Sequence, residues 1–277
     1  MKNFFLTLSA FAVMGSLLFI GTGCSKTDEE ESAAGLPIPK GASKQLVLRV
    51  GFDAEFPPYG YRDDDGNLVG FDLDLAKEVA QRRGWGIELK PIDWDAKDAE
   101  LNSGTINCIW NGFTINGREE LYTWTEPYVD NSQVVLVKNS NGIKALADLA
   151  GRVVEAQADS SGLAALNDDE HAELKAGLKK VVEVPNFNQA FMELEAGVCD
   201  AVVVDEGVAL SFIKDHAADF SILDETLKSE QYGVGFKLGN EELRDQVQET
   251  LNEMIEDGTF KTISEKWFDG KDVTIRK

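Results

Sequence analysis

Histidine and cysteine are scarce in this chain, which has two and three of them among 277 residues. Neither His171 nor His216 has a cysteine at a spacing typical of metal ligands, so the sequence predicts no metal site and no cofactor. Cys108 and Cys199 both lie in apolar runs typical of strands. A disulfide needs Cα atoms within about 7 Å of each other, and we assign the two runs to separate parts of the fold. We therefore expect buried free thiols.

Positively charged residues are also few relative to negatively charged ones. The 27 Lys and Arg residues face 49 Asp and Glu residues, which gives a formal net charge of −22. Removal of residues 1–23 makes it −23, because Lys2 is the only charged residue among them. An acidic surface repels phosphate backbones, so the composition argues against nucleic acid as a partner.

Long apolar runs are absent after the first two dozen residues. The one long run, residues 4–20, follows Lys2 and ends in small residues before Cys24, with no Lys/Arg cluster behind it. It predicts a signal peptide over residues 1–23 and not a membrane domain. A cysteine in this place resembles the lipobox of bacterial lipoproteins, although Gly21 stands where lipoboxes usually carry leucine. The resemblance implies that Cys24 carries acyl chains such as palmitate and becomes the mature N-terminus.

Two kinds of segment follow the apolar run. Residues 24–43 are rich in Asp, Glu, Ser, Ala, Gly and Pro and predict a flexible tether. Residues 44–277 alternate strand-like and helical patterns over a length sufficient for two domains, which predicts an α/β fold. We expect strands at 46–52, 87–92, 106–110, 133–138, 152–157, 181–184, 201–204 and 232–237. We expect the main helices at 70–84, 188–196, 207–214, 240–257 and 259–267, with shorter ones at 146–149, before 103 and after 158.

The stretch WNGFTINGR, from 110 to 118, has the composition of a binding surface for an amino acid. Arg118 can hold a carboxylate with two parallel hydrogen bonds. Thr114 and the backbone around Asn111 and Gly112 can meet an ammonium. The stretch follows a buried strand, which is where open α/β sheets place their ligands. The alternative is an arginine on a solvated loop. The aromatic residues that could shield the ligand are Trp110 and Phe113.

Two further segments offer charge complementarity to a small ligand. The segment 158–162 lies at the start of a predicted helix, where free N–H groups and the hydroxyl of Ser160 or Ser161 can bind an anion. Asp205 follows the buried strand 201–204 and presents a carboxylate at its end. The alternative for Asp205 is that it caps the next helix.

Taken together, these motifs make the chain after residue 44 resemble the family 3 extracellular solute-binding proteins, the amino-acid-capturing subunits of bacterial ABC importers. The resemblance has two departures: Arg83 replaces a small or apolar residue in the family signature, and the segment that ends at Arg118 is one residue shorter than usual. The matching motifs are GFDLDLA at 70–76, DWD at 93–95, LNSG at 101–104, TI at 114–115, EPY at 126–128, DAVVVDE at 200–206 and KWF at 266–268.

The resemblance implies a periplasmic-binding-protein type II fold, with two lobes joined by two crossing strands and the ligand between the lobes. Lobe 1 would comprise residues 44–132 and 231–277, and lobe 2 residues 133–230. It also implies that Arg118 and the backbone at Ser160 and Ser161 bind the ligand's carboxylate, and that Thr114, the Gly112 backbone and Asp205 bind its ammonium. The residues implied around the ligand's side chain are Asp53, Phe56, Tyr59 and Trp110.

For several of these residues a purely structural role is an alternative. Phe56 and Tyr59 could cover the edge of lobe 1, and we expect Trp94 to pack in the core. Asp53 could accept backbone N–H groups in its own turn instead of facing a ligand. The carboxylates at 72 and 74 are expected to cap their helix.

A buried zwitterion needs both charges met, because its desolvation otherwise prevents binding. The predicted function is therefore capture of a free amino acid, polar or cationic, and its delivery to the permease subunits of an ABC importer through closure of the lobes. The protein would act as an extracytoplasmic monomer held to the outer face of the cell membrane by its lipid anchor alone. Two alternatives remain: a dehydratase-like enzyme of the same fold with Glu55 or Glu206 as acid or base, and a ligand-sensing lipoprotein without a transporter.

Overall fold

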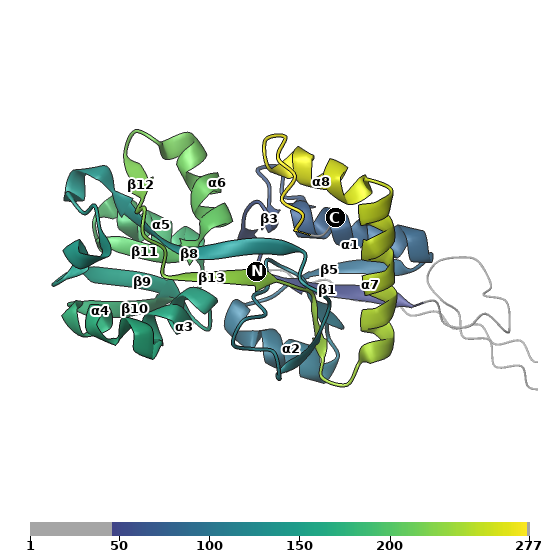
Figure 1. Ribbon diagram of the computed structural model, residues 1–277. Coiled ribbons are helices and arrows are strands. Elements are labelled where there is room, and N and C mark those ends of the chain that lie inside the picture. The colour runs from purple at the N-terminus through teal and green to yellow at the C-terminus, as the bar shows by residue number, and fades with distance from the viewer. Residues whose placement is uncertain (1–45, 276–277) are drawn as a thin grey trace, which may run out of the picture. The chain divides into compact units, whose positions relative to one another are not determined.

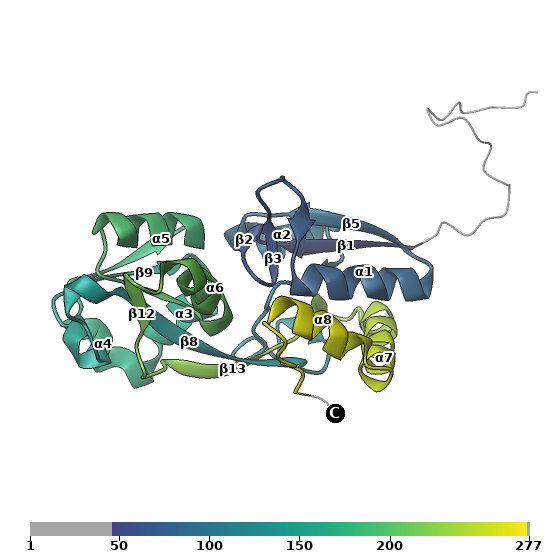
Figure 2. The same cartoon turned by 90° about the horizontal axis from the view of Figure 1, so that it is seen from above.

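The computed structural model describes residues 46–275. The predicted signal peptide, the tether and Cys24 lie outside the described residues, so those assignments stay predictions. No helix within residues 46–275 is long and apolar enough to cross a bilayer. The described chain contains two larger sheets and a small one, with helices packed around them (Figures 1 and 2).

The first sheet has the strand order β5-β1-β6-β14-β7. Its strand β1 pairs in parallel with β5 and β6, while β14 pairs antiparallel with β6 and β7. The strands are β1 (Val47–Phe52), β5 (Gly86–Pro91), β6 (Cys108–Ile109), β7 (Tyr122–Trp124) and β14 (Gly235–Lys237). The helices of this lobe are α1 (Phe71–Arg83), α2 (Lys97–Ser103), α7 (Glu241–Glu256) and α8 (Thr259–Trp267), with the 3-10 helix η1 (Trp94–Ala96) before α2.

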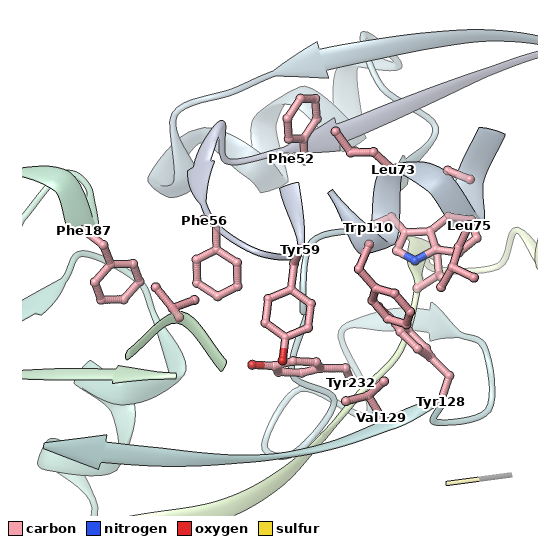
Figure 3. Close-up of a cluster of buried hydrophobic side chains, with 14 of the residues drawn as sticks. Phe52, Phe56, Tyr59, Leu73, Leu75, Trp110, Tyr128, Val129, Phe187 and Tyr232 are labelled. Carbon is pink, nitrogen blue, oxygen red and sulfur yellow. The ribbon is translucent and has the colours of Figure 1, made fainter. Parts of the chain in front are cut away.

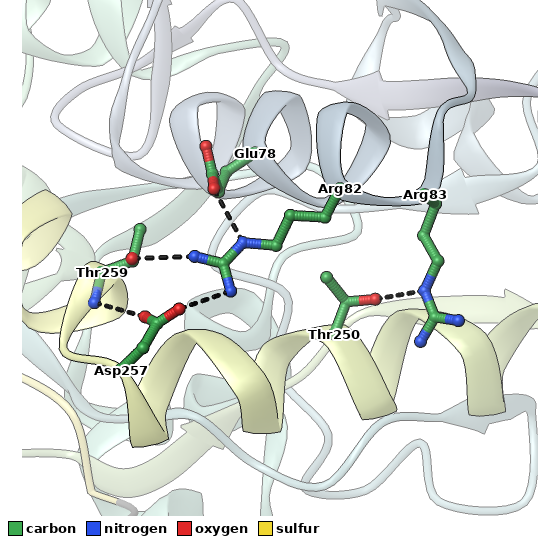
Figure 4. A network of polar contacts seen from close by, with 6 residues as sticks. All are labelled: Glu78, Arg82, Arg83, Thr250, Asp257 and Thr259. Atoms are coloured by element: carbon green, nitrogen blue, oxygen red, sulfur yellow. Dashed lines mark hydrogen bonds and ion pairs between the residues drawn. The ribbon is translucent and has the colours of Figure 1, made fainter.

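Helix α1 buries one apolar face and ends where predicted, at Gly84 in the left-handed conformation with φ 65°. Its last residues, Arg82 and Arg83, attach it to α7 and to the start of α8 (Figure 4). Arg82 pairs with Asp257 at 2.7 Å, and Arg83 Nε donates to the buried Thr250 hydroxyl at 2.5 Å. The arginine that departs from the family signature therefore serves packing between helices that are distant in the sequence.

The second sheet has the order β10-β9-β11-β8-β12, and β13 pairs with β8 outside this path. Strands β9, β10 and β11 are mutually parallel, whereas β8 is antiparallel to its neighbours. The strands are β8 (Val129–Lys138), β9 (Val153–Gln157), β10 (Lys180–Val184), β11 (Ala201–Asp205), β12 (Phe220–Ile222) and β13 (Lys228–Tyr232). The helices are α3 (Ser161–Asn167), α4 (Ala172–Gly177), α5 (Phe187–Ala196) and α6 (Glu206–His216), with 3-10 helices η2 (Asn139–Asn141), η3 (Leu146–Leu149) and η4 (Asp169–His171).

Strands β8 and β13 lie side by side and run from one lobe to the other (Figures 1 and 2). The far part of β8 pairs with β11 and β12 in the second sheet, while Tyr232 at the end of β13 bridges to Thr114 of the first lobe. The two-lobed fold with two crossing strands is thus present. The exact lobe boundaries at residues 132 and 231 stay predictions.

The predicted strand at 232–237 is wrong as a single element. Tyr232 ends β13, Gly235 begins β14, and the two strands belong to different sheets. The backbone at Gly233 bonds instead to the carbonyl of Phe113, which redirects the chain into the first sheet. The predicted strand at 106–110 is also shorter than expected, because only Cys108 and Ile109 pair as β6.

A small sheet of β2 (Glu55–Phe56), β3 (Gly60–Arg62) and β4 (Leu68–Val69) brings aromatic side chains toward the second lobe. Phe56 lies 5.8 Å from Phe187 of α5 between ring centroids, and Tyr59 meets Tyr232 edge-on at 5.3 Å (Figure 3). One continuous apolar cluster therefore extends from the first lobe across the crossing strands into the second. Cys108 and Cys199 are buried free thiols, as predicted.

Candidate ligand-binding site

A cavity between the two lobes gathers most of the predicted site residues. It lies where β6, β9 and β11 end, which is the edge where parallel strands place ligands. Arg118 of the first lobe and Asp205 of the second face this shared space, as the sequence hypothesis requires. The lining residues are Phe56, Trp94, Asn111, Gly112, Thr114, Arg118, Gln157, Ser160, Ser161 and Asp205.

Arg118 is half-buried and held in place by its own loop. Its guanidinium carbon lies 5.3 Å from the centre of the Phe113 ring, and its Nη1 donates to the carbonyl of Thr114 at 3.4 Å. Nη2 donates to the carbonyl of Asp159 in the second lobe at 3.1 Å. A guanidinium has five N–H donors, so donors remain for a carboxylate. These contacts favour the cavity over the alternative of an arginine on a solvated loop, and the ligand role of Arg118 stays a prediction.

The start of α3 faces Arg118 across the cavity. Ser160 caps the helix, because its hydroxyl accepts a hydrogen bond from the Leu163 N–H at 3.0 Å. The hydroxyl of Ser161 takes part in a network across the cleft: it accepts from Gln133 Nε2 at 2.9 Å and lies 3.2 Å from Thr114 Oγ1. Ser161 and Thr114 therefore link the lobes at the edge of the cavity.

Asp205 is buried, with 4% of its surface exposed. Its Oδ1 accepts hydrogen bonds from Asn131 and Gln133 at 2.8 Å and from the Tyr232 hydroxyl at 2.6 Å. Its side chain makes no capping hydrogen bond to α6, so the capping alternative is wrong. Burial, and then the nearby charge of Glu230, raise the pKa of Asp205 to about 8.

Glu230 is a component of the site that the sequence analysis missed. It is 3% exposed, and its Oε1 accepts from Thr114 Oγ1 at 2.8 Å as well as from the amides that hold Asp205. Its Oε2 has no hydrogen-bond partner among the described residues. Side chains alternate along a strand, so Glu230 shares a face with the buried Tyr232. The expected strand begins only at residue 232, whereas β13 begins at Lys228. Without that strand, the alternation that places Glu230 on the buried face cannot be recognised.

Asp53 and Gln157 form a second contact across the cleft. Asp53 is 5% exposed, accepts from the backbone of Glu55 at 2.8 Å, and accepts from Gln157 Nε2 at 2.6 Å. Burial raises the pKa of Asp53, and the hydrogen bond from Gln157 opposes that shift. Asp53 thus accepts a backbone N–H group in its own turn, as the structural alternative predicts. It contacts the cavity only through Gln157, a lining residue that was not predicted from the sequence.

Of the aromatic side chains considered for the ligand site, some line the cavity and others do not. Phe56 lines the cavity, and so does Trp94, although Trp94 also packs edge-on against Phe113 in the core as expected. Trp110 lies fully buried in the core beside Tyr128 (Figure 3). Tyr59 packs on Tyr232 and against Gly207 at the start of α6, outside this cavity. The structure therefore does not bring Trp110 and Tyr59 to the cavity, because both rings are used to pack the first lobe and the crossing strands.

Asp72 has a different role from the predicted helix cap. It is fully buried, and its carboxylate accepts from the Gly112 N–H at 2.5 Å and the Tyr128 hydroxyl at 2.8 Å. Burial raises the pKa of Asp72 to about 7. Gly112 has φ 55°, and a Cβ there would lie 2.9 Å from Phe56. Asp72 therefore holds a glycine turn that forms the floor of the cavity.

The comparisons with known proteins agree on the kind of protein. The chain is 33% identical over 234 residues to the L-cystine-binding protein TcyJ of Escherichia coli, with 82% of this chain and 84% of TcyJ covered. It is similar to a solved substrate-binding protein of an ABC uptake transporter from Streptococcus pneumoniae with bound histidine (TM-score 0.79, 33% identity, 83% and 95% of the two chains covered). It is also similar to an ancestral arginine-binding protein bound to arginine (TM-score 0.75, 41% identity, 81% and 99% covered).

The family model for bacterial extracellular solute-binding proteins, family 3, matches residues 48–270. This match spans both lobes, both crossing strands and every residue that lines the cavity. The chain therefore belongs to the bacterial extracellular solute-binding proteins of family 3.

Proposed function

We propose that this protein captures a free amino acid outside the cytoplasm and delivers it to an ABC importer by closing its lobes. The observation that carries the proposal is the shared cavity of Arg118 and Asp205, which come from opposite lobes. The cavity has a volume of about 10 Å³, so the lobes must separate to admit a zwitterion, which then meets a cation from one side and a carboxylate from the other. Ligand contacts then exist in the closed form that the open form lacks, so binding favours closure.

The ligand's two charges have separate partners in this proposal. Arg118 and the backbone N–H groups at Ser160 and Ser161 bind its carboxylate. Asp205, Thr114 and the Gly112 carbonyl bind its ammonium. Asn111 Oδ1 adds an acceptor, because it is buried and has no partner within residues 46–275. The unpartnered Oε2 of Glu230 gives the ammonium side of the site a second carboxylate.

The charge balance of the site favours a cationic amino acid. Arg118 and Asp205 line the cavity, and two further buried carboxylates, those of Asp53 and Glu230, contact lining residues. A neutral zwitterion leaves the negative charge of these two additional carboxylates in place, which burial makes costly. A ligand with an additional positive charge on its side chain reduces the excess, and we assign Asp53, which contacts the lining residue Gln157, as its partner. Bound arginine and histidine in the similar structures are consistent with this choice.

An uncharged polar amino acid is the second candidate. It is favoured by the raised pKa of Asp205, since a proton retained by the carboxylate pair would remove part of the excess charge. Thermal-shift screening against the standard amino acids and cystine tests both candidates, because a ligand stabilises the folded form in proportion to the logarithm of its concentration. We expect arginine and histidine to give the largest shifts. A screen in which no amino acid raises the unfolding temperature would contradict the proposal.

We further propose that the protein binds without catalysis and acts as a lipid-anchored monomer. The residues that line the cavity include no histidine, and the chain belongs to a family of solute-binding proteins. Recovery of unchanged ligand after incubation tests the first point. The mass of the mature N-terminus tests acylation at Cys24, and ultracentrifugation tests the monomer. Loss of amino-acid uptake on deletion distinguishes an importer subunit from a sensor.

A further inference from the structure

Lys97 is a buried cation beside the ligand cavity. It is the first residue of α2 in the first lobe, and 1% of its surface is exposed. Its Nζ lies 5.1 Å from the centre of the Trp94 ring and forms an ion pair with the Asp159 carboxylate of the second lobe. A buried ammonium is costly unless a carboxylate meets it. The carboxylate that meets Lys97 comes from the other side of the cleft.

Asp159 receives two contacts from the first lobe. Its carboxylate pairs with Lys97, and its backbone carbonyl accepts from Arg118 Nη2 at 3.1 Å. It lies between β9 and α3 with φ 56°, in a left-handed conformation that only glycine, asparagine and aspartate adopt readily. Its side chain is half-exposed, with 54% accessible. Asp159 thus connects Arg118 to the start of α3, although Asp159 does not itself line the cavity.

We propose that Lys97 and Asp159 form a bridge between the lobes beside the cavity, which positions Arg118 for the ligand and must break before the lobes open. The inference rests on the proposed function, because it assigns a step in ligand release. A ligand enters the open form, in which the two residues are apart, so the bridge leaves association unchanged. It slows dissociation, because opening exposes Lys97 and removes the carbonyl partner of Arg118.

The two partners differ in burial, and this gives the bridge a distinctive mutational signature. Asp159→Asn leaves the Lys97 ammonium buried without a carboxylate whenever the lobes close, which penalises the closed form. Lys97→Met retains an unbranched stem against Trp94 and leaves Asp159 half-exposed, where water solvates its carboxylate. Lys97→Met therefore loses the bridge without leaving a buried charge unpaired. The asparagine variant is the more harmful one, and Lys97→Met should reduce its effect in the double variant.

The test measures the equilibrium affinity by calorimetry and the dissociation rate by stopped flow, on the mature protein with the tightest amino acid from the screen. We expect Asp159→Asn to raise both Kd and the dissociation rate by about 10-fold or more. Lys97→Met should raise both by about 3-fold, because it removes the bridge but leaves no buried charge unpaired, and the double variant should match Lys97→Met. Association rates should stay the same throughout.

Two control variants separate the bridge from other effects. Asp168→Asn removes the 3.0 Å pair with Lys228, whose partners both lie in the second lobe, and should leave ligand release unchanged. Asp159→Gly removes the carboxylate but suits the positive φ, so an effect that it shares with Asp159→Asn comes from the lost charge and not from backbone strain.

Two results would overturn the bridge: wild-type dissociation from Asp159→Asn, or a Lys97→Met variant as impaired as Asp159→Asn with no rescue in the double variant. A wild-type protein that binds no amino acid is a different result, since it contradicts the proposed function itself. Unfolding temperatures without ligand identify any variant that fails to fold. If Asp159→Asn alone fails to fold, the comparison of the double variant with Lys97→Met still tests the bridge.

Discussion

At the scale of single residues, the site depends on charges that the protein holds in low-solvent surroundings. Arg118 is anchored by Phe113 and by two carbonyls, so little ordering remains for it when a carboxylate arrives. Asp205 and Glu230 share the same two amide donors, which places two carboxylates next to each other in the interior. If these groups bind the ligand as proposed, we expect them to set both its affinity and the pH dependence of that affinity.

Arg118→Ala should remove most amino-acid binding while the fold survives. Two charge-assisted hydrogen bonds contribute about 3 kcal/mol together, which corresponds to a loss of about 100-fold or more in affinity. Calorimetry measures the change. Arg62→Ala is the matched control, because Arg62 bonds to the carbonyl of Gly66 on an exposed turn far from the cavity. Near-native affinity in Arg118→Ala would mean that the carboxylate is bound elsewhere.

Ligand affinity should rise with pH up to about 8. The pKa of Asp205, raised from 3.8 to about 8, means that the empty site holds a proton below that pH. An ammonium beside the carboxylate lowers its pKa, so binding releases the proton and is weaker where the proton is held. The apparent Kd should fall by up to about tenfold per pH unit on approaching pH 8 from below.

Glu230→Gln tests the cause of this pH dependence. The charge of Glu230 helps to raise the pKa of Asp205, so its removal should move the rising part of the affinity profile to lower pH. Calorimetry between about pH 5 and pH 8.5, in buffers of different ionisation enthalpy, measures both the profile and the released proton. A profile that is flat in the wild type, or that is unmoved in Glu230→Gln, would show that the carboxylate pair does not hold the proton.

At the scale of elements, helix α1 shows how packing uses residues that local patterns do not explain. Its apolar positions face the first sheet, but its C-terminal arginines connect it to α7 and α8 (Figure 4). The same helix carries Asp72, which holds the glycine turn at the floor of the cavity. The position of α1 therefore couples the stability of the first lobe to the shape of the site.

Arg83→Ala should destabilise the protein by roughly 1–2 kcal/mol, because it leaves the buried Thr250 hydroxyl without its donor and removes the 2.7 Å pair with Glu249. Chemical denaturation measures the free energy of unfolding. Thr250→Val, which removes the hydroxyl but keeps the volume, should account for part of the loss, and the two changes together should be less than additive. Strict additivity would indicate that the two side chains do not act as a pair.

At the scale of the whole molecule, closure depends on contacts that come together only between lobes. Asp53 with Gln157, Thr114 with Ser161, and Lys97 with Asp159 all lie around the cavity. Strands β8 and β13 cross between the lobes beside them and can act as the hinge. A ligand in the cavity adds its own contacts to both sides of this set.

Ligand binding should therefore raise the unfolding temperature of the protein and also reduce its radius of gyration. At a ligand concentration of about 100 Kd, stabilisation of about 2.7 kcal/mol should raise the unfolding temperature by roughly 5–10 °C. Small-angle scattering should show a smaller radius of gyration with ligand than without. A thermal shift with no change in that radius would argue that the ligand binds without moving the lobes.

The sequence by itself determined the α/β class, most helix ends and the two main charged residues that line the cavity, Arg118 and Asp205. Glycines at 84, 104 and 197 end helices because they adopt the left-handed conformation. Asp205 ends the buried strand β11, and Arg118 lies in the loop after β6, so local patterns were sufficient to find them. Only the tertiary structure decided that Gln157 lines the cavity, that Glu230 and Lys97 contact residues of its lining, and that Trp110 and Tyr59 do not reach it. Those roles arise from contacts between segments tens of residues apart in the sequence. Side chains at the cleft are buried only when both lobes cover them, which no local pattern can indicate.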